Sequence, residues 1–271
     1  MVNPDWARSA WLRLALGLAL TPCAAGLVAA LGSNAHVTQR VADAVVFAGG
    51  ALLPVLGLAL AATCETPLVF ALALAGACGV LVLAGVAQAH SPSPLLVDTS
   101  LVAIAWGLGS SLGRRVQHAS HLLPACVVAG CADLASVLSP EGPSHAIAQS
   151  DRALSVLATW FPEPGTHAVA PALGIGDLLF MGLVFGVARA HALPYARTAV
   201  LCLLGTALAG AAAALFGVPV PALPAIVLCV LIGMPATRRV RREDRRAARW
   251  SMIIACSLAL ATIARNFWRP S

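Results

Sequence analysis

The sequence predicts an all-α membrane protein, a polytopic bundle of about nine transmembrane helices that forms one membrane domain over residues 1–271. The 271 residues are 59% hydrophobic and only 10% charged, and the mean hydropathy is +0.87. A chain with so few polar side chains cannot cover a water-soluble fold. Its long apolar runs are typical of transmembrane helices, which satisfy their backbone hydrogen bonds internally.

Nine apolar runs are candidate membrane spans. They cover residues 11–31, 41–62, 66–89, 94–113, 121–139, 169–188, 195–216, 220–234 and 250–264. The last two are shorter than the roughly 20 residues that a bilayer core of ~30 Å requires. For the ninth run, a helix lying in the bilayer interface is an alternative.

Basic residues concentrate between the runs. Arg114 and Arg115 follow the fourth run, Arg189 and Arg197 separate the sixth from the seventh, and seven arginines follow the eighth. With nine spans these segments lie on one side of the membrane, which the positive-inside rule assigns to the cytoplasm together with the N-terminus. The formal net charge of +6 therefore reflects topology and not nucleic-acid binding. We expect a multi-pass protein of the cell membrane.

The longest segment between runs covers residues 140–168. Ile147, Leu154, Leu157 and Phe161 recur there at helical spacing, which predicts an interfacial helix. A solvated linker is an equal alternative.

Two aspartates lie inside apolar runs. Asp133 lies six residues before the end of the fifth run, and Asp177 lies eight residues after the start of the sixth. At ~1.5 Å per residue, both lie about 9–12 Å from the intervening segment, so antiparallel helices would bring the carboxyls to one level. An acid at membrane depth costs roughly 2.5–3.5 kcal/mol and is a candidate functional residue. Two at one depth indicate a paired-carboxylate site.

Such a pair has a recognised chemistry. Two carboxyls close enough to share a proton can hydrolyse a peptide bond, because one takes a proton from water while the other polarises the carbonyl. The sequence does not assign either role. Asp98, four residues into the fourth run, is expected to lie at the bilayer interface or to pack, with a polar role near the cavity as the alternative.

Small residues and prolines surround the expected site. We expect Gly174 and Gly176 to lie one turn before Asp177 on the same helix, where missing side chains let a substrate or the Asp133 helix approach. Ordinary small-residue helix packing is the alternative. Pro221 and Pro224 indicate irregular backbone beside a cavity or, alternatively, a helix start with an early proline.

Three motifs carry a resemblance to a known family. The first consists of Asp133, Leu134, Val137, Leu138, Pro140, Gly142 and Pro143. The second is Gly174-Ile175-Gly176-Asp177-Leu178-Leu179-Phe180, and the third is Pro221, Ala222, Leu223 and Pro224. Together they resemble the presenilins and signal peptide peptidases, the GxGD intramembrane aspartyl proteases, over about residues 133–234.

The resemblance implies a presenilin-type fold and a catalytic pair, Asp133 and Asp177. It also implies that Gly174, Gly176 and the box Pro221–Pro224 shape the substrate site, and that the substrates are membrane-spanning peptides. Two features depart from the family pattern: Ala132 stands where the family usually has Tyr, and four runs precede Asp133 where presenilins have five. With a cytoplasmic N-terminus, the catalytic helices run in the sense of the signal peptide peptidases.

These motifs divide the membrane domain into three regions. Residues 1–113 are N-terminal helices of unassigned role, 121–234 form the catalytic core, and 235–271 form a basic loop and a short C-terminal helix. No cofactor or metal is implied, because the eight cysteines form no C-x-x-C pair and no H-E-x-x-H occurs. Besides substrates and lipid, accessory subunits stay open as partners.

Two other functions stay open. Intramembrane acids and proline-broken helices also build proton-coupled transporters and channels, although here the acids are nearly isolated. An inactive relative that serves as a scaffold is the second alternative, although both aspartates are present.

Overall fold

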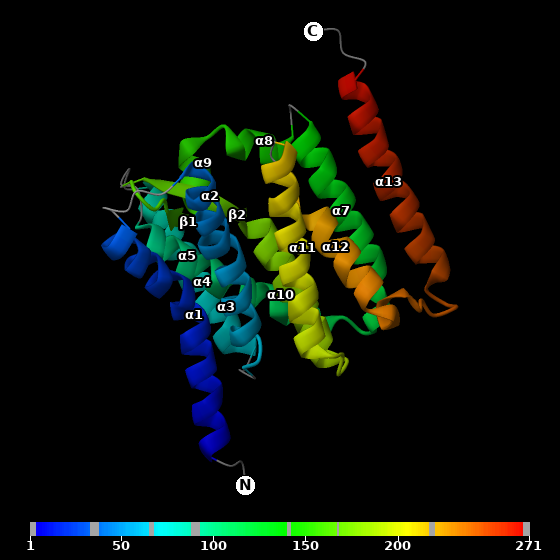
Figure 1. Ribbon diagram of the computed structural model, residues 1–271. Helices are drawn as coiled ribbons and strands as arrows, with labels where there is room; N and C mark the ends of the chain where they lie inside the picture. The colour runs from blue at the N-terminus through cyan, green and yellow to red at the C-terminus, as the bar shows by residue number, and fades with distance from the viewer. Residues whose placement is uncertain are drawn as a thin grey trace. The chain divides into compact units, whose positions relative to one another are not determined.

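The computed structural model describes residues 4–32, 38–64, 68–87, 93–139, 142–166, 168–216 and 220–267 (Figure 1). The N-terminal elements are α1 (Pro4–Gly32), α2 (Gln39–Phe47), η1 (Ala48–Leu52), α3 (Leu53–Ala61), α4 (Leu68–Ala87), α5 (Pro94–Ile104), η2 (Ala105–Gly109) and α6 (Ser110–Arg115). Then come η3 (Ala119–His121), α7 (Leu122–Leu138), α8 (Pro143–Ala148), α9 (Asp151–Leu157), β1 (Ala158–Pro162) and β2 (Val169–Gly174). The chain continues through α10 (Ile175–Ala190), α11 (Tyr195–Phe216), α12 (Ala222–Gly233), η4 (Pro235–Arg238) and α13 (Arg245–Phe267).

Six helices among the described residues are long and apolar enough to cross a membrane. They are Ser9–Ala30, Gln39–Ala61, Pro94–Arg115, Ala119–Leu138, Tyr195–Phe216 and Arg245–Arg265. These helices confirm the prediction of a polytopic helical membrane protein and match six of the nine predicted runs. The last of them is correctly located but was predicted too short: the C-terminal helix α13 has 23 residues.

The other three predicted runs differ from one another. The run at 66–89 also forms a long helix, the 20-residue α4 (Leu68–Ala87), within which Val69–Val80 is the apolar stretch. The run at 220–234 forms the 12-residue α12. The run at 169–188 was assigned wrongly, because its first six residues form β2 and only then does α10 begin. The six residues are nearly all apolar, so their composition did not distinguish a strand from a helix.

The chain forms two compact units. Unit 1 comprises Met1–Arg114 and Arg152–Gly186, and unit 2 comprises Arg115–Asp151 and Val187–Ser271. The predicted catalytic core at 121–234 therefore contributes residues to both units, with Asp177 in unit 1 and Asp133 in unit 2.

Close helix crossings at glycines hold unit 1 together. A Cβ atom on Gly17 of α1 would collide with the carbonyl oxygen of Gly57 on α3, and one on Gly57 would collide with that of Gly17. Gly182 of α10 likewise lies against the backbone of Ala105 in η2. Helices in a bilayer pack by such close approach, since lipid provides little hydrophobic drive for association.

The segment 140–168, where an interfacial helix or a solvated linker was predicted, contains two short helices and the first strand of a hairpin. Within 140–168, helices α8 and α9 are short, and the chain then enters β1, which pairs antiparallel with β2. Phe161, which we expected on the apolar face of the helix, is 2% exposed on β1 and packs with Ala25 and Val46. Pro140 of the first motif lies outside the described residues.

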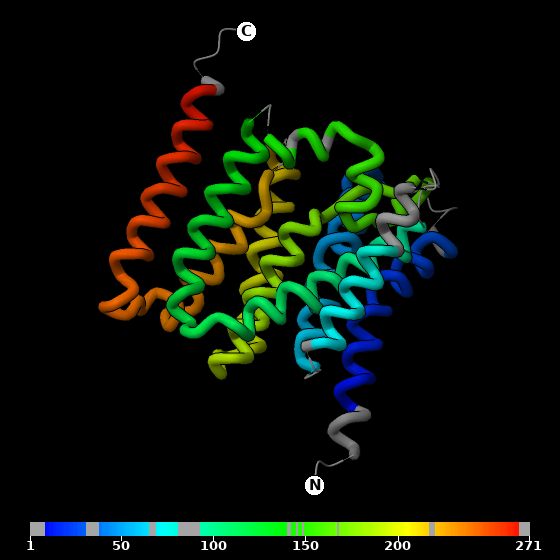
Figure 2. The backbone as a smooth tube through the Cα atoms, turned by 180° about the vertical axis from the view of Figure 1, so that it is seen from behind, coloured from blue at the N-terminus to red at the C-terminus, as the bar shows by residue number. Residues whose placement is uncertain are grey.

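Unit 2 is built from four main helices. Helix α12 packs against α11 and α7, and α13 packs along the other side of α7, as Figures 1 and 2 both show. The α11–α12 contact is close, because a Cβ on Gly205 would collide with the Cα of Ile226.

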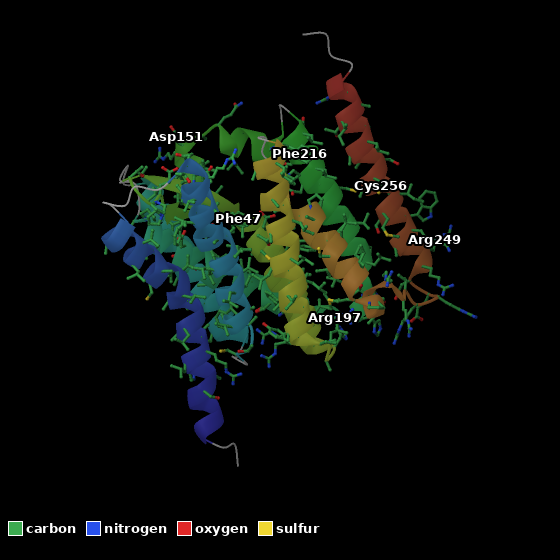
Figure 3. All side chains as sticks on the ribbon, viewed as in Figure 1. Phe47, Asp151, Arg197, Phe216, Arg249 and Cys256 are labelled. Carbon is green, nitrogen blue, oxygen red and sulfur yellow. The ribbon has the colours of Figure 1, made fainter. Side chains whose placement is uncertain are left out.

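The basic segments of unit 2 lie at one end of it. His121 Nε2 at the start of α7 lies 3.0 Å from Asp244 Oδ2 just before α13, and η3 contacts η4. In Figure 3, Arg197 and Arg249 lie at this end, while Phe216 lies at the opposite end of α11. The basic segments therefore share one end of this unit. That this end faces the cytoplasm stays a prediction.

We expect Gly17→Ala to destabilise the protein by about 1–3 kcal/mol, because backbone atoms of α3 would have to move. Gly26→Ala in the same helix is the matched control, since no atom lies within 4 Å of its Cβ position, and alanine favours a helix by up to about 1 kcal/mol. Thermal unfolding in detergent, followed by tryptophan fluorescence, measures both. Equal midpoints for the two variants would contradict the close crossing of α1 and α3.

Candidate functional site

Asp133 lies on α7, five residues before the helix ends at Leu138. Its side chain is half-buried. The backbone N–H of Leu223 donates a hydrogen bond to its carboxylate, whereas Oδ2 has no hydrogen-bond partner among the described residues. The carboxyl is thus held at one point and keeps one oxygen for another partner.

The box Pro221–Pro224 provides that N–H donor because it is the start of a helix. Pro221 is the N-cap of α12 in an extended conformation (φ −62°, ψ 131°), and Ala222 and Leu223 are its first two residues. Pro224 comes third, where a missing N–H costs nothing because the first four N–H groups of a helix have no intrahelical acceptor. Of the two predicted conformations for this box, the helix start with an early proline is therefore correct. The box places this helix start beside the carboxyl of Asp133.

The helix start also suits a negative charge. The N-terminus of a helix carries a partial positive charge equivalent to roughly half a unit, and its free N–H groups bind anions. Gly130, one turn before Asp133 on α7, lets the helices meet here: its Cβ position is 3.8 Å from both Pro224 Cα and Val227 Cγ2. The start of α12 thereby offers a carboxylate at Asp133 a backbone donor within an apolar helix pair.

Asp177 lies in unit 1, in the first turn of α10. The prediction that it lies eight residues into a helix, with Gly174 and Gly176 one turn before it on the same helix, is wrong. Gly174 ends β2, and Gly176 is the second residue of α10. Because β2 takes the first six residues of the run, the depth estimate for Asp177 from helical rise fails as well.

The two glycines still clear space beside Asp177. A Cβ on Gly174 would lie 3.6 Å from Asp177 Oδ2, in direct contact with the carboxyl. No atom of unit 1 lies within 4 Å of the Cβ position on Gly176, and Gly176 is exposed. The backbone around Asp177 is thus open to a ligand from the side of both glycines.

Asp98 anchors the hairpin that leads to Asp177. Its side chain on α5 is fully buried, and its Oδ1 accepts a hydrogen bond of 2.8 Å from the backbone N–H of Trp160 on β1. Asp98 is therefore enclosed by protein and does not reach the surface of the bundle. Of its two expected settings, packing is correct. Sequence reasoning missed its partner because β1 was not predicted.

Two further contacts fix the hairpin on η1. Thr159 Oγ1 donates to the carbonyl of Gly50 and accepts from the N–H of Leu173 on β2 at 3.1 Å. The ring of Phe161 occupies the space that a side chain on Gly49 would need. The pair of glycines in η1 is thus the sequence signal that a second element packs closely there.

Metal ligands do not converge in the described part of the chain. No group of three or more His, Cys, Asp or Glu side chains is placed to hold an ion there. All eight cysteines are free thiols. The sulfur atoms of Cys131 and Cys256 lie 3.6 Å apart.

The long apolar helices define a polytopic helical membrane protein. Unit 1 carries Asp177 at the start of α10, and unit 2 carries Asp133 on α7. Comparison with known proteins finds no matching family model, no matching curated protein and no matching solved structure. The resemblance to the presenilins and signal peptide peptidases therefore rests on the motifs alone, and the pairing of Asp133 with Asp177 stays a prediction.

We expect Asp98→Ala to loosen the hairpin, whereas Asp98→Asn should leave it ordered. Alanine removes the acceptor for the Trp160 N–H, while asparagine keeps an oxygen at that position. Loss of a hydrogen bond of about 1 kcal/mol raises the local opening constant about fivefold. Hydrogen exchange of peptides covering residues 158–174 measures this. Unchanged exchange in Asp98→Ala would show that Asp98 does not hold the hairpin.

Proposed function

We propose that this protein is an intramembrane aspartyl endopeptidase of presenilin type that hydrolyses peptide bonds in membrane-spanning substrates. Asp133 and Asp177 would form the catalytic pair. The observation that carries the proposal is the setting of Asp133, whose carboxylate accepts the Leu223 N–H while Oδ2 has no partner among the described residues.

This setting suits one half of an aspartyl dyad. A carboxyl with one oxygen fixed by a backbone donor has a defined orientation, so its other oxygen can hold a proton or a water at a constant position. The start of α12 also favours the charged form locally. We therefore expect Asp133, when it is the ionised member of the pair, to hold the attacking water.

Asp177 suits the other half. It follows β2 directly, and its neighbours Gly174 and Gly176 leave its surroundings in unit 1 open. Two carboxyls within hydrogen-bond distance cannot both ionise, so one proton is shared and the pair titrates as a unit. The protonated carboxyl would polarise the scissile carbonyl while the ionised one takes the proton of the water.

The hairpin supports a mode of substrate binding. In the sheet that the structure describes, β2 pairs only with β1, so its second edge has no strand partner there and could pair with an extended peptide. A substrate helix must unwind before a carboxyl can reach the carbonyl of its scissile bond. Pairing with a strand edge then satisfies the backbone hydrogen bonds of the unwound peptide. A substrate strand beside β2 would lead directly to Asp177.

We expect Asp133→Asn and Asp177→Asn each to reduce cleavage of a model transmembrane peptide by about 10²–10⁴-fold, the usual contribution of a general acid or base. Asparagine keeps the size of the side chain and an acceptor for the Leu223 N–H, so folding should persist. Purified protein in detergent, with mass-spectrometric detection of the products, measures the rates.

Asp151→Asn is the matched control for these variants, because Asp151 is an exposed acid at the start of α9 and should retain full activity. Cleavage that persists in both dyad variants would falsify the peptidase proposal. If Asp151→Asn also loses cleavage, the loss comes from removing a negative charge anywhere in the protein and not from the proposed pair.

A second experiment tests the pairing itself. In a chain whose native cysteines are replaced by serine or alanine, Asp133→Cys combined with Asp177→Cys should be joined by a short bifunctional thiol reagent in native membranes. The linked protein should give a shifted fragment pattern after proteolysis between the two positions. Each single-cysteine variant is the control, and absence of the intramolecular link would exclude a shared proton.

A further inference from the structure

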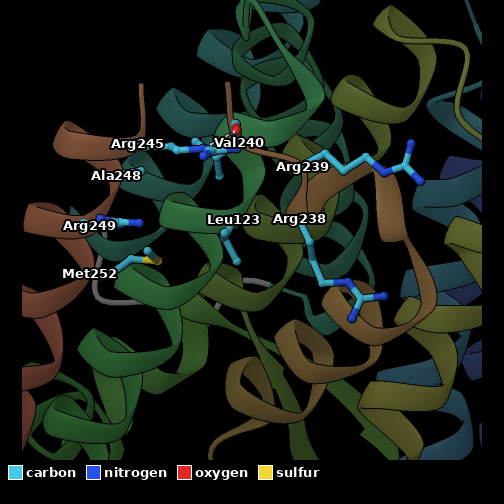
Figure 4. A pocket seen from close by; sticks show the side chains of 8 residues that line it. All are labelled: Leu123, Arg238, Arg239, Val240, Arg245, Ala248, Arg249 and Met252. Carbon is cyan, nitrogen blue, oxygen red and sulfur yellow. Dashed lines mark hydrogen bonds between the residues drawn. The ribbon is translucent and has the colours of Figure 1, made fainter. Parts of the chain in front are cut away.

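A pocket in unit 2 lies beside the first turn of α13. Its volume is about 610 Å³, and it is lined by Leu123, Arg238, Arg239, Val240, Arg245, Ala248, Arg249 and Met252. Figure 4 shows Arg245 and Arg249 extending from α13 toward Val240 and Leu123. The guanidinium groups of Arg238 and Arg239 extend away from α13, so these two residues line the pocket mainly with their chain segment.

The arginines of this pocket have no acidic partner among the described residues. The two acids of the neighbouring segment are already engaged: Glu243 Oε1 lies 3.2 Å from Arg241 Nη1, and Asp244 Oδ2 lies 3.0 Å from His121 Nε2. Arg245 Nε donates only to the carbonyl of Val240, at 3.3 Å. The positive charge around the pocket is therefore uncompensated, and it suits an anion with several acceptor oxygens.

The pocket is apolar on its other side. Leu123 belongs to the span Ala119–Leu138, and Ala248 and Met252 belong to the span Arg245–Arg265. Both spans begin here, so the pocket lies where two helices enter the bilayer. Basic groups at the surface with apolar side chains one turn deeper match the two parts of a lipid, a charged headgroup and the start of an acyl chain.

We propose that this pocket is a binding site for an anionic glycerophospholipid. Arg245 and Arg249 would bind the headgroup phosphate, and Leu123 and Met252 would contact the upper acyl carbons. The bound lipid would hold α13 against α7 at their shared end. This inference is independent of the peptidase proposal, because none of these residues belongs to the aspartyl site.

A lipid titration of the purified full chain in detergent tests the site. Dioleoyl phosphatidylglycerol should raise the thermal unfolding midpoint, whereas dioleoyl phosphatidylcholine, with the same acyl chains and no net charge, should not. Arg245→Gln/Arg249→Gln should weaken the apparent affinity for phosphatidylglycerol about tenfold or more. Arg242→Gln/Arg246→Gln is the matched control, since it removes the same charge from arginines that do not line the pocket.

Three results would overturn the proposal. Equal weakening in both double variants would show that bulk charge attracts the lipid. Stabilisation by inorganic phosphate or glycerol phosphate at the same concentration would identify a soluble phosphate as the ligand. If the pocket double variant fails to fold, Leu123→Trp replaces it, because this change fills the apolar side of the pocket and keeps all the arginines. Unaltered affinity of Leu123→Trp for phosphatidylglycerol would exclude the pocket as the binding site.

Discussion

A carboxyl group within an apolar helix bundle depends on backbone N–H donors, and this requirement connects the unusual features of the chain. Regular helices and paired strand edges use their N–H groups internally, so donors are left where an element starts, bulges or has an unpaired edge. The start of α12 supplies one to Asp133, and β1 supplies one to Asp98. Asp177 lies at a helix start itself, where the helix dipole favours its charge.

The two buried acids of this set have different tasks. Asp98 is fully buried and holds a structural hairpin in place, which accounts for an ionisable group that the catalytic proposal does not use. Asp133 is only half-buried. In both acids Oδ2 is buried and has no hydrogen-bond partner among the described residues, so the two acids differ in the burial of the residue and in the element that donates to the carboxyl.

Much of the helical bundle follows from the apolar runs, because a run of about 20 apolar residues has few stable alternatives in a bilayer. The hairpin does not follow, because Val169 to Gly174 is nearly all apolar and its periodicity fits a strand or a buried helix equally. That one element moved Asp177 from the interior of a predicted helix to the start of an observed one. Asp98 was likewise placed by a contact with β1, 62 residues away in the chain.

The sequence by itself determined that this is a polytopic helical membrane protein, which acids lie within its apolar runs, and that its arginines gather between those runs. These properties depend on composition and local order along the chain. Only the tertiary structure decided that Pro221–Pro224 forms a helix start against Asp133, that Asp98 holds a strand, and that two arginines of α13 face a pocket. Each of these depends on which backbone group meets which side chain, and residues far apart in sequence determine that.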